Sequence, residues 1–351
     1  MLYIRADGNA EIGIGHIMRC LSIAKAHRKS GGDCTFITAD TNMKPLLDEQ
    51  GFSVICLDSK WDDLSQETEK MERLIEERKI EKLLVDSYFV TPDYLSRLHK
   101  LTYLIYMDDL DAFVYPCSAL INYNIYADKL CYSARYDNTK LLLGLKYTPI
   151  REEFMDMPTR KISEDVHSVL VLTGGADPYN VAGKFTSRAM VYDGLSRLAY
   201  HIVSGRFNEH LPELLVLSKK YSGITIHQNI SNLSKLMLEC DIAVSAGGST
   251  LYELCASGMP AVIFASADNQ LAAISAFSEG YMLGCGDYRE DPDTCLEKLV
   301  AGIAKLTKET KLRQEFSSKC RDLVDGLGAY RISDSLRTQY LTMCQKNRFR
   351  L

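Results

Sequence analysis

The chain has 351 residues, of which 46% are hydrophobic and 25% are charged, and these are ordinary values for a globular protein. They exclude a disordered chain, a collagen-like repeat and a coiled coil, and the length predicts about two domains that each bury a core. The formal net charge is -5, from 41 basic and 46 acidic residues, so no overall positive field attracts nucleic acid.

The first half of the chain alternates short apolar runs with amphipathic segments. Continuous apolar runs are typical of strands buried on both faces of a sheet. They cover residues 2–6, 34–38, 52–57, 82–86, 102–107 and 119–122. Residues 64–79 are predicted to be helical, because their apolar side chains fall on one face and charges fill the rest. This alternation predicts a parallel sheet with helices on both sides.

A second α/β pattern follows a charged stretch. Residues 149–165 carry a proline and lack a core-facing period, so they are interpreted as a linker. Strands are then expected at 167–172, 199–203, 223–227, 241–246 and 260–265, and the chain is helical and charged after residue 292. We therefore expect an N-terminal domain at 1–150, a linker at 151–165 and a C-terminal domain with C-terminal helices at 166–351. Two such units predict a cleft lined by loops at the carboxyl ends of the strands.

The eleven cysteines support neither a zinc site nor a disulfide framework. Their number is odd, their spacing is irregular and no C-x-x-C pair occurs, so reduced thiols are expected. The opening MLYIRADG is a short strand rather than a signal peptide, and no apolar run approaches the roughly 18 residues of a membrane helix. We expect a cytoplasmic protein that binds neither nucleic acid nor a membrane. The sequence does not define its oligomeric state.

A glycine-rich loop joins the first strand to the first helix. Gly13 and Gly15 allow a tight turn and a close approach to a ligand, but the dinucleotide fingerprint and the P-loop lysine are both missing. His16 stands in the first turn of the helix. The positive end of the helix dipole disfavours the imidazolium, which leaves a neutral ring suited to general base catalysis. The alternative is a histidine that caps its helix or bonds its own loop.

A second loop has the composition of an anion site. Gly247, Gly248, Ser249 and Thr250 lie between an apolar run and a helix, where backbone N–H groups converge on phosphates in many proteins. Glu253 lies one turn further on and is suited to accept hydrogen bonds from ribose hydroxyls. The alternative is a capping box formed by Thr250 and Glu253, which needs no ligand.

Other strand ends carry polar residues that have either a ligand-binding or a structural interpretation. Gly174 and Gly175 either approach a ligand or form a tight turn, and residues 266–270 either contact a sugar or cap the next helix. Asp86 with Tyr88, and the pair at 108–109, suggest a metal, hydroxyl recognition or no ligand. No cluster of His and Cys supports a transition metal, so a metal is the least favoured of these.

One motif identifies a family resemblance. The pattern R-x-D-x-x-x-x-I-G-x-G-H-x-x-R-C-L spans residues 5–21, and VDSY at 85–88, MDD at 107–109, N-x-N-x-Y at 122–126, REEF at 151–154 and GG-x-D at 174–177 accompany it. Together they resemble the PseG-type UDP-sugar hydrolases of pseudaminic acid biosynthesis, relatives of the MurG-like glycosyltransferases with the GT-B fold. The resemblance runs to about residue 285, and the remainder resembles longer bacterial members labelled spore-coat polysaccharide proteins. Ser87 departs from relatives that carry histidine there, which leaves the stereochemistry of the sugar open.

The resemblance implies a fold and a reaction. The fold is α/β and GT-B-like, with two Rossmann-like domains whose parallel sheets face a central cleft. UDP-2,4-diacetamido-2,4,6-trideoxy-β-L-altropyranose would be hydrolysed to the free sugar and UDP, with inversion at the anomeric carbon and without a metal or cofactor. His16 corresponds to the base that activates water.

The resemblance and the loop patterns together give the expected contacts. Substrate contacts are expected from Asp7, Gly13, Gly15, Arg19, Tyr88, Asp108, Asn124, Arg151, Asn269 and Gln270. Nucleotide contacts are expected from Gly174, Gly175, Gly247, Gly248, Ser249, Thr250 and Glu253. The rival functions are a GT-B glycosyltransferase that uses a UDP-sugar donor, a hydrolase for a related nonulosonic acid precursor and a nucleotide-sugar sensor without activity. Transferases that use lipid acceptors usually expose an apolar patch, and the sequence shows no obvious one.

Overall fold

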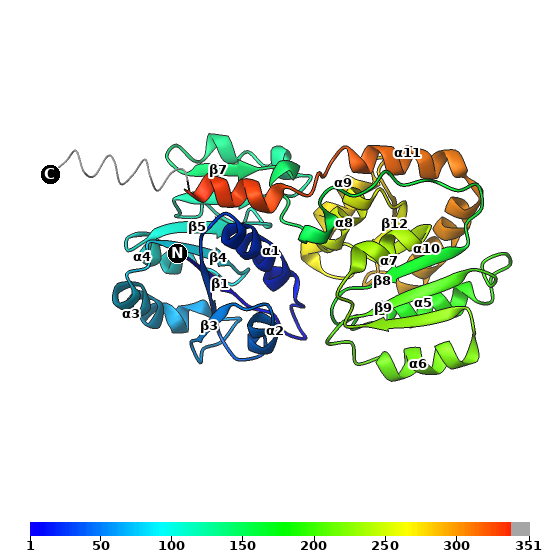
Figure 1. Ribbon diagram of the computed structural model, residues 1–351, viewed down its shortest axis with the longest axis horizontal. Helices are drawn as coiled ribbons and strands as arrows, with labels where there is room; N and C mark the ends of the chain where they lie inside the picture. Colours follow the sequence, from blue (N-terminus) through cyan, green and yellow to red (C-terminus); the bar gives the residue numbers. More distant parts are fainter. Residues whose placement is uncertain (338–351) are drawn as a thin grey trace. The chain divides into compact units, whose positions relative to one another are not determined.

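The computed structural model describes residues 1–337, and it divides the chain into two units that each contain a parallel sheet (Figure 1). The first unit comprises residues 1–9, 16–150 and the described residues from 327 on, and the second comprises residues 10–15 and 151–326. The expected α/β class with two parallel sheets is confirmed.

The first sheet has seven parallel strands in the order β3-β2-β1-β4-β5-β6-β7. The strands are β1 (Leu2–Ala6), β2 (Cys34–Thr38), β3 (Ser53–Cys56), β4 (Lys82–Asp86), β5 (Tyr103–Met107), β6 (Ala119–Asn122) and β7 (Lys140–Leu143). All but β7 are predicted from their apolar runs. Strand β7 pairs only with β6, and its edge position explains why three of its four residues stay half-exposed.

Helices cover this sheet and continue its core. They are α1 (Gly15–Lys29), α2 (Lys44–Glu49), α3 (Thr68–Arg78), α4 (Pro92–His99) and the short 3-10 turns η1 (Leu64–Glu67), η2 (Ala127–Lys129), η3 (Tyr132–Ala134) and η4 (Leu145–Tyr147). The helix predicted at 64–79 is thus η1 followed by α3. Met71 and Ile75 of α3 pack against Leu83, Val85 and Leu104 of the sheet. Residues 328–337 form a further helix, which His27 of α1 contacts through Ser333 at 3.1 Å.

A fully buried ion pair joins β1 to η1. Arg5 donates from Nε and Nη2 to the two carboxylate oxygens of Glu67 at 2.7 and 2.8 Å, and neither side chain is exposed. Ser59 Oγ and Tyr94 OH also donate to Glu67, at 2.6 and 3.0 Å. Because a buried charge is costly without a partner, this pair fixes where η1 meets the sheet.

The second sheet has six parallel strands in the order β10-β9-β8-β11-β12-β13. The strands are β8 (Ser168–Leu172), β9 (Ala199–Ser204), β10 (Ile224–Gln228), β11 (Ile242–Ala246), β12 (Ala261–Ala265) and β13 (Leu283–Asp287). The helices are α5 (Val181–Ala189), α6 (Leu211–Lys220), α7 (Leu233–Glu239), α8 (Thr250–Ser257), α9 (Leu271–Ser278), α10 (Pro292–Lys308) and α11 (Thr310–Arg321), with the turns η5 (Glu152–Phe154) and η6 (Asp268–Gln270). The sequence does not predict β13, because Gly284 and Gly286 interrupt its apolar run.

The segment interpreted as a linker is anchored on the second unit. Arg160 donates to the backbone carbonyls of Ser257 and Cys240 at 3.1 and 2.7 Å. Arg313 of α11 donates to the carbonyls of Ser163 and Glu164 at 2.6 and 2.8 Å. Apart from residues 10–15, the chain enters the second unit at residue 151 and returns to the first after residue 326.

Two further expectations concern the described part of the chain. The ten cysteines within residues 1–337 are all free thiols, while Cys344 lies outside the described residues. No helix among residues 1–337 is both long and apolar enough to span a bilayer.

Replacing Glu67 by glutamine tests the buried pair. The change removes the fully buried counter-charge of the Arg5 guanidinium and leaves Asp7 as its remaining partner, so we expect the lower end of the roughly 3–5 kcal/mol that breaking a buried pair costs. We expect a loss of about 3 kcal/mol in the free energy of unfolding, measured in urea by the fluorescence of Trp61, the single tryptophan. The matched control is Glu72→Gln, whose partner Arg97 lies at the surface with a side chain 37% exposed, and it should shift the midpoint far less. Equal shifts in the two variants would contradict the assignment.

Candidate active site

His16 is presented by the start of α1. The helix begins at Gly15, so the ring stands in its first turn, and the preceding loop needs a glycine because Gly13 has φ +70°. Arg19 follows one turn later on the same helix face. Both side chains reach Asp86, which ends β4 and is 1% exposed.

Asp86 orients the His16 ring. The distance from His16 Nδ1 to Asp86 Oδ1 is 2.6 Å, and Arg19 Nη2 lies 3.1 Å from the same nitrogen. A guanidinium only donates hydrogen bonds, so the carboxylate is the partner that fits a protonated Nδ1. We assign the Nδ1 proton on this hydrogen-bond pattern. In the neutral ring Nε2 is then the nitrogen that accepts a proton.

Arg19 neutralises the buried carboxylates around the ring. It donates from Nε to Asp86 Oδ2 at 2.7 Å and from Nη2 to Oδ1 at 2.5 Å. Its Nη1 donates to Asp109 Oδ2 at 2.7 Å and to Tyr123 OH at 2.8 Å. Burial alone would raise the pKa of Asp86, but Arg19 and His16 hold that pKa well below its ordinary range. Asp86 therefore stays an anionic acceptor.

Two further side chains complete this arrangement through Asp109. Tyr88 OH donates to Asp109 Oδ2 at 2.9 Å, and Asn124 Nδ2 donates to Oδ1 at 2.8 Å. The Tyr88 ring stands edge-on to His16 with ring centres 4.5 Å apart. Burial raises the pKa of Tyr88, so its hydroxyl keeps its proton. We call this set the His16 cluster; its members are His16, Arg19, Asp86, Tyr88, Asp109, Tyr123 and Asn124.

Asp7 and Asp108 lie outside the His16 cluster. Asp7 pairs with Arg5 and accepts a hydrogen bond from the Ala39 backbone at 2.7 Å. Asp108 is fully buried and accepts hydrogen bonds from Tyr132 OH and from backbone N–H groups of its own loop. Both carboxylates thus accept hydrogen bonds from residues of the first unit itself. Asp109 joins the His16 cluster instead of Asp108, although the sequence does not predict Asp109 as a contact.

The loops that carry Tyr88 and Asp109 also expose apolar side chains. Phe89 is 37% exposed, Leu110 is 43% exposed and Val114 is 53% exposed. The sequence shows no obvious apolar patch because Phe89 lies in a different loop from Leu110 and Val114. Phe89 follows Tyr88 and Leu110 follows Asp109 in the sequence, so each is next to a member of the His16 cluster. Val114 lies further along the loop that carries Asp109.

In the second unit, α8 begins without a side-chain cap. Ser249 is its N-cap and forms no side-chain cap hydrogen bond, while the amides of Gly248, Leu251 and Tyr252 donate to backbone carbonyls at 2.9, 3.1 and 3.1 Å. A Cβ at Gly247 would lie 2.9 Å from Gln270 and Ile274 side chains, whereas a Cβ at Gly248 would meet open space. The loop therefore packs tightly on one side and leaves backbone accessible on the other, as an anion site requires.

The other glycine loop differs at the start of α5. Asp177 accepts hydrogen bonds from Val181 N at 2.8 Å and from Ala182 N at 3.0 Å, and Asn180 accepts one from Gly183 N at 3.1 Å. The first amides of α5 are thus occupied by its own side chains. At the start of α8, by contrast, the N-cap side chain forms no such bond.

Glu253 forms an ion pair instead of a capping box. Arg151 donates from Nε and Nη2 to its two carboxylate oxygens, both at 2.7 Å. Gln270, by contrast, accepts a hydrogen bond from the backbone of Ser266 at 2.8 Å, and Asn269 lies exposed in η6. Glu253 is therefore the predicted nucleotide residue whose orientation the fold fixes most firmly.

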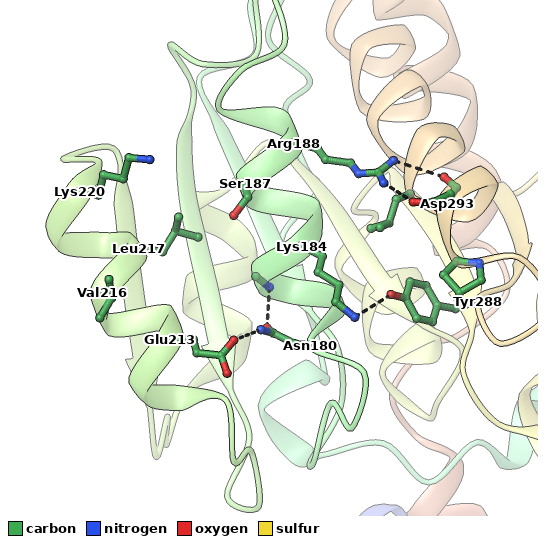
Figure 2. A pocket seen from close by; sticks show the side chains of 13 residues that line it. Asn180, Lys184, Ser187, Arg188, Glu213, Val216, Leu217, Lys220, Tyr288 and Asp293 are labelled. Atoms are coloured by element: carbon green, nitrogen blue, oxygen red, sulfur yellow. Dashed lines mark hydrogen bonds and ion pairs between the residues drawn. The ribbon is translucent and has the colours of Figure 1, made fainter.

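A cavity of about 650 Å³ also opens on the second unit, between α5, α6 and the start of α10 (Figure 2). Several of its polar side chains bond to one another. Arg188 bonds Asp293, Asn180 bonds Glu213 at 2.6 Å, and Lys184 lies 3.3 Å from the Tyr288 hydroxyl. None of the predicted site residues lines it. Within residues 1–337, no group of three or more His, Cys, Asp or Glu is arranged to hold a metal.

Comparison with known sequences gives relatives but no matching family model. The spore coat polysaccharide biosynthesis protein SpsG of Bacillus subtilis is 25% identical over 344 residues, which cover 96% of this chain and 98% of that protein. The UDP-2,4-diacetamido-2,4,6-trideoxy-beta-L-altropyranose hydrolase of Campylobacter jejuni is 26% identical over 252 residues, covering 71% and 85%. An uncharacterised protein of Methanocaldococcus jannaschii is 27% identical over 273 residues, and the match spans 54% of its length.

Solved structures define the fold. MurG of Acinetobacter baumannii superimposes with a TM-score of 0.64 at 13% identity, covering 96% of this chain and 99% of that one. MnaA of S. aureus, in a structure with UDP, gives a TM-score of 0.67 at 12% identity, covering 97% and 96%. The chain is thus similar in sequence to the PseG-type hydrolase and to SpsG, and it has the GT-B fold of MurG, as the sequence predicts.

Substitution of Asp86 by asparagine should change the His16 tautomer. Arg19 would donate to the amide oxygen and turn the amide NH₂ toward Nδ1, which favours the proton on Nε2. We expect the Nδ1–H tautomer in the parent protein at pH 8.5 and the Nε2–H tautomer in the variant. Long-range ¹H–¹⁵N correlation spectra measure this, with the signal assigned by its loss in His16→Gln. An unchanged tautomer would rule out Asp86 as the orienting group.

Proposed function

We propose that this chain is an enzyme that hydrolyses a UDP-linked diacetamido-trideoxyhexose to the free sugar and UDP. The observation that carries the proposal is the Asp86–His16 pair, which supplies a base oriented by a buried carboxylate at the carboxyl end of a parallel sheet. The similarity to the Campylobacter jejuni hydrolase supports the substrate class. The GT-B fold supports the use of a nucleotide sugar.

In the proposed reaction His16 activates water. The water oxygen bonds to the anomeric carbon as the bond from that carbon to the diphosphate oxygen breaks, and the water proton passes to His16 Nε2. Attack opposite the leaving group inverts the anomeric centre. Asp86 stabilises the imidazolium that forms, as carboxylates do in other histidine-dependent hydrolases. A base of this kind contributes about 10²–10⁴-fold to the rate.

The second unit supplies the leaving-group contacts in this proposal. Backbone N–H groups of the 247–250 loop bind the diphosphate and stabilise the charge that develops on it. Glu253 accepts hydrogen bonds from the ribose hydroxyls. Diphosphate is already a good leaving group, so the step requires no metal and no strong general acid. Tyr88, Asn124 and Asn269 are the proposed contacts to the sugar.

A glycosyltransferase is the second candidate, and one observation favours it. Phe89, Leu110 and Val114 are exposed apolar side chains in the loops that also carry Tyr88 and Asp109 of the His16 cluster, and such side chains suit an apolar acceptor. In that case the attacking oxygen belongs to an acceptor hydroxyl instead of water. The same base and the same leaving-group contacts would serve either reaction.

His16→Ala tests the base. We expect kcat for UDP release to fall by about 10²–10⁴-fold, while the Kd for UDP changes less than about threefold because the nucleotide contacts lie elsewhere. UDP release and the anomer of the sugar are followed by NMR, and UDP affinity by calorimetry. Equal rates in the parent and the variant would discard His16 as the base.

Omitting the acceptor separates the two candidate reactions. Incubation of the parent protein with a panel of UDP-sugars and no acceptor should release UDP and free sugar at the full rate if water is the nucleophile. Release that appears only after an apolar or sugar acceptor is added would support the transferase. A further control is Leu110→Ser with Val114→Ser, which should slow a reaction with an apolar acceptor and leave hydrolysis unchanged.

A further inference from the structure

Arg151 and Glu253 form a fork that is rigid on both sides. The guanidinium approaches the carboxylate edge-on, with Nε to Oε1 and Nη2 to Oε2 both at 2.7 Å. The Glu253 side chain is 8% exposed and that of Arg151 is 25% exposed. Burial alone would lower the pKa of Arg151, but Glu253 and Glu153 raise it above its usual value. The guanidinium of Arg151 therefore keeps its charge.

The turn that carries Arg151 is itself fixed. Phe154 in η5 is 1% exposed, and its ring lies under the Arg151 guanidinium at 5.4 Å. Glu153 lies 3.1 Å from Arg151 Nη1 and accepts a hydrogen bond from Ser234 N at the start of α7 at 3.3 Å. The η5 turn also packs against α7 and α8. Arg151 thus reaches Glu253 from a braced position.

We infer that Arg151 is a positioning residue for ribose recognition, acting through Glu253. The inference rests on the proposed function, because it assumes that Glu253 accepts the ribose hydroxyls. Glu253 stands one turn after Ser249 on the same face of α8. A nucleotide with its diphosphate at the start of α8 brings its ribose to this face. Arg151 fixes the plane of the carboxylate that receives the two hydroxyls.

The fork leaves acceptor capacity on Glu253. An ionised carboxylate offers about four lone-pair sites, and Arg151 uses two of them. Asp86 shows in the same chain that a carboxylate held in this way accepts further donors. Arg19 grips it through Nε and Nη2, and His16 Nδ1 still bonds to Oδ1 at 2.6 Å. By the same count, Glu253 keeps lone pairs to accept hydrogen bonds from the vicinal hydroxyls.

A purely structural role makes a different prediction. Arg160 supplies the comparison, because it donates to the carbonyl of Ser257 at the end of α8 at 3.1 Å and to that of Cys240 after α7 at 2.7 Å, rather than to Glu253. If Arg151 only held the 151–154 turn against α8, replacing it would lower the stability as replacing Arg160 does, without a separate effect on nucleotide binding. If it orients Glu253, its loss changes how the protein distinguishes ribose from deoxyribose.

The test measures Kd for UDP and for 2′-deoxy-UDP by calorimetry in the parent protein and in Arg151→Gln, Arg151→Lys, Glu253→Gln and Arg160→Gln. A charged hydrogen bond to the 2′-hydroxyl should make the parent prefer UDP about tenfold or more. We expect Glu253→Gln and Arg151→Gln to reduce this ratio to about two. Arg151→Lys should restore part of it, since lysine supplies the charge but not the fork. Arg160→Gln should lower the Tm and keep the ratio.

The outcomes separate the two levels of the proposal. A ribose preference that survives in Arg151→Gln but is lost in Glu253→Gln overturns the role of Arg151 and leaves the proposed function intact. A parent protein that binds neither nucleotide overturns the proposed function itself. A lost preference in Arg160→Gln as well as Arg151→Gln would show that any weakening of α8 has this effect, and it would also overturn the inference.

Discussion

The buried carboxylate of Asp86 is the constraint on which the first unit's site depends. A carboxylate this deep in a protein is costly unless charged or donor groups surround it. Arg19 and His16 provide them from one face of α1, three residues apart, so the helix must begin at Gly15 for both to reach β4. Gly13 makes that start possible, since its φ of +70° suits glycine. The position of a loop glycine and the orientation of the imidazole are thus consequences of one buried charge.

Much of this could be read from the sequence, because the periodicities are local. Apolar runs predict eleven of the thirteen strands, and the two that are missed, β7 and β13, are edge strands with little burial or with interrupting glycines. The start of α1 and the place of His16 in its first turn also follow from local signals. The carboxylate partners do not, because Asp86 lies 70 residues from His16 and Asp109 lies 90 residues from Arg19, and nothing local tells Asp108 from Asp109. Asp108 and Asp109 are both polar residues after the same strand, and only the fold shows that Asp109 is the one that reaches Arg19.

The two glycine loops of the second unit show how a similar pattern acquires different chemistry. Both follow a buried parallel strand and lead into a helix. In the loop before α5, Asp177 and Asn180 fold back and occupy the first amides of the helix. In the loop before α8, the short hydroxyl side chains of Ser249 and Thr250 take no such role. Because a helix N-terminus binds either its own cap or an external anion at the same N–H groups, the residue types after the glycines decide whether the helix start is capped by its own side chains.

Arginine forks hold a carboxylate in each unit, and this bears on selectivity as well as stability. Asp86 and Glu253 are each gripped through Nε and Nη2 of an arginine. A bidentate fork fixes the plane of the carboxylate, whereas a lysine or a water would let it rotate. A carboxylate that rotates can accept hydrogen bonds from many donors but binds none of them strongly. A fixed carboxylate binds best the donor whose hydrogen already points along its remaining lone pairs. For Asp86 that donor is the imidazole, which is held in one tautomer as a result. For Glu253 the same physics favours a rigid pair of neighbouring hydroxyls over a single flexible one, and a furanose diol has that geometry.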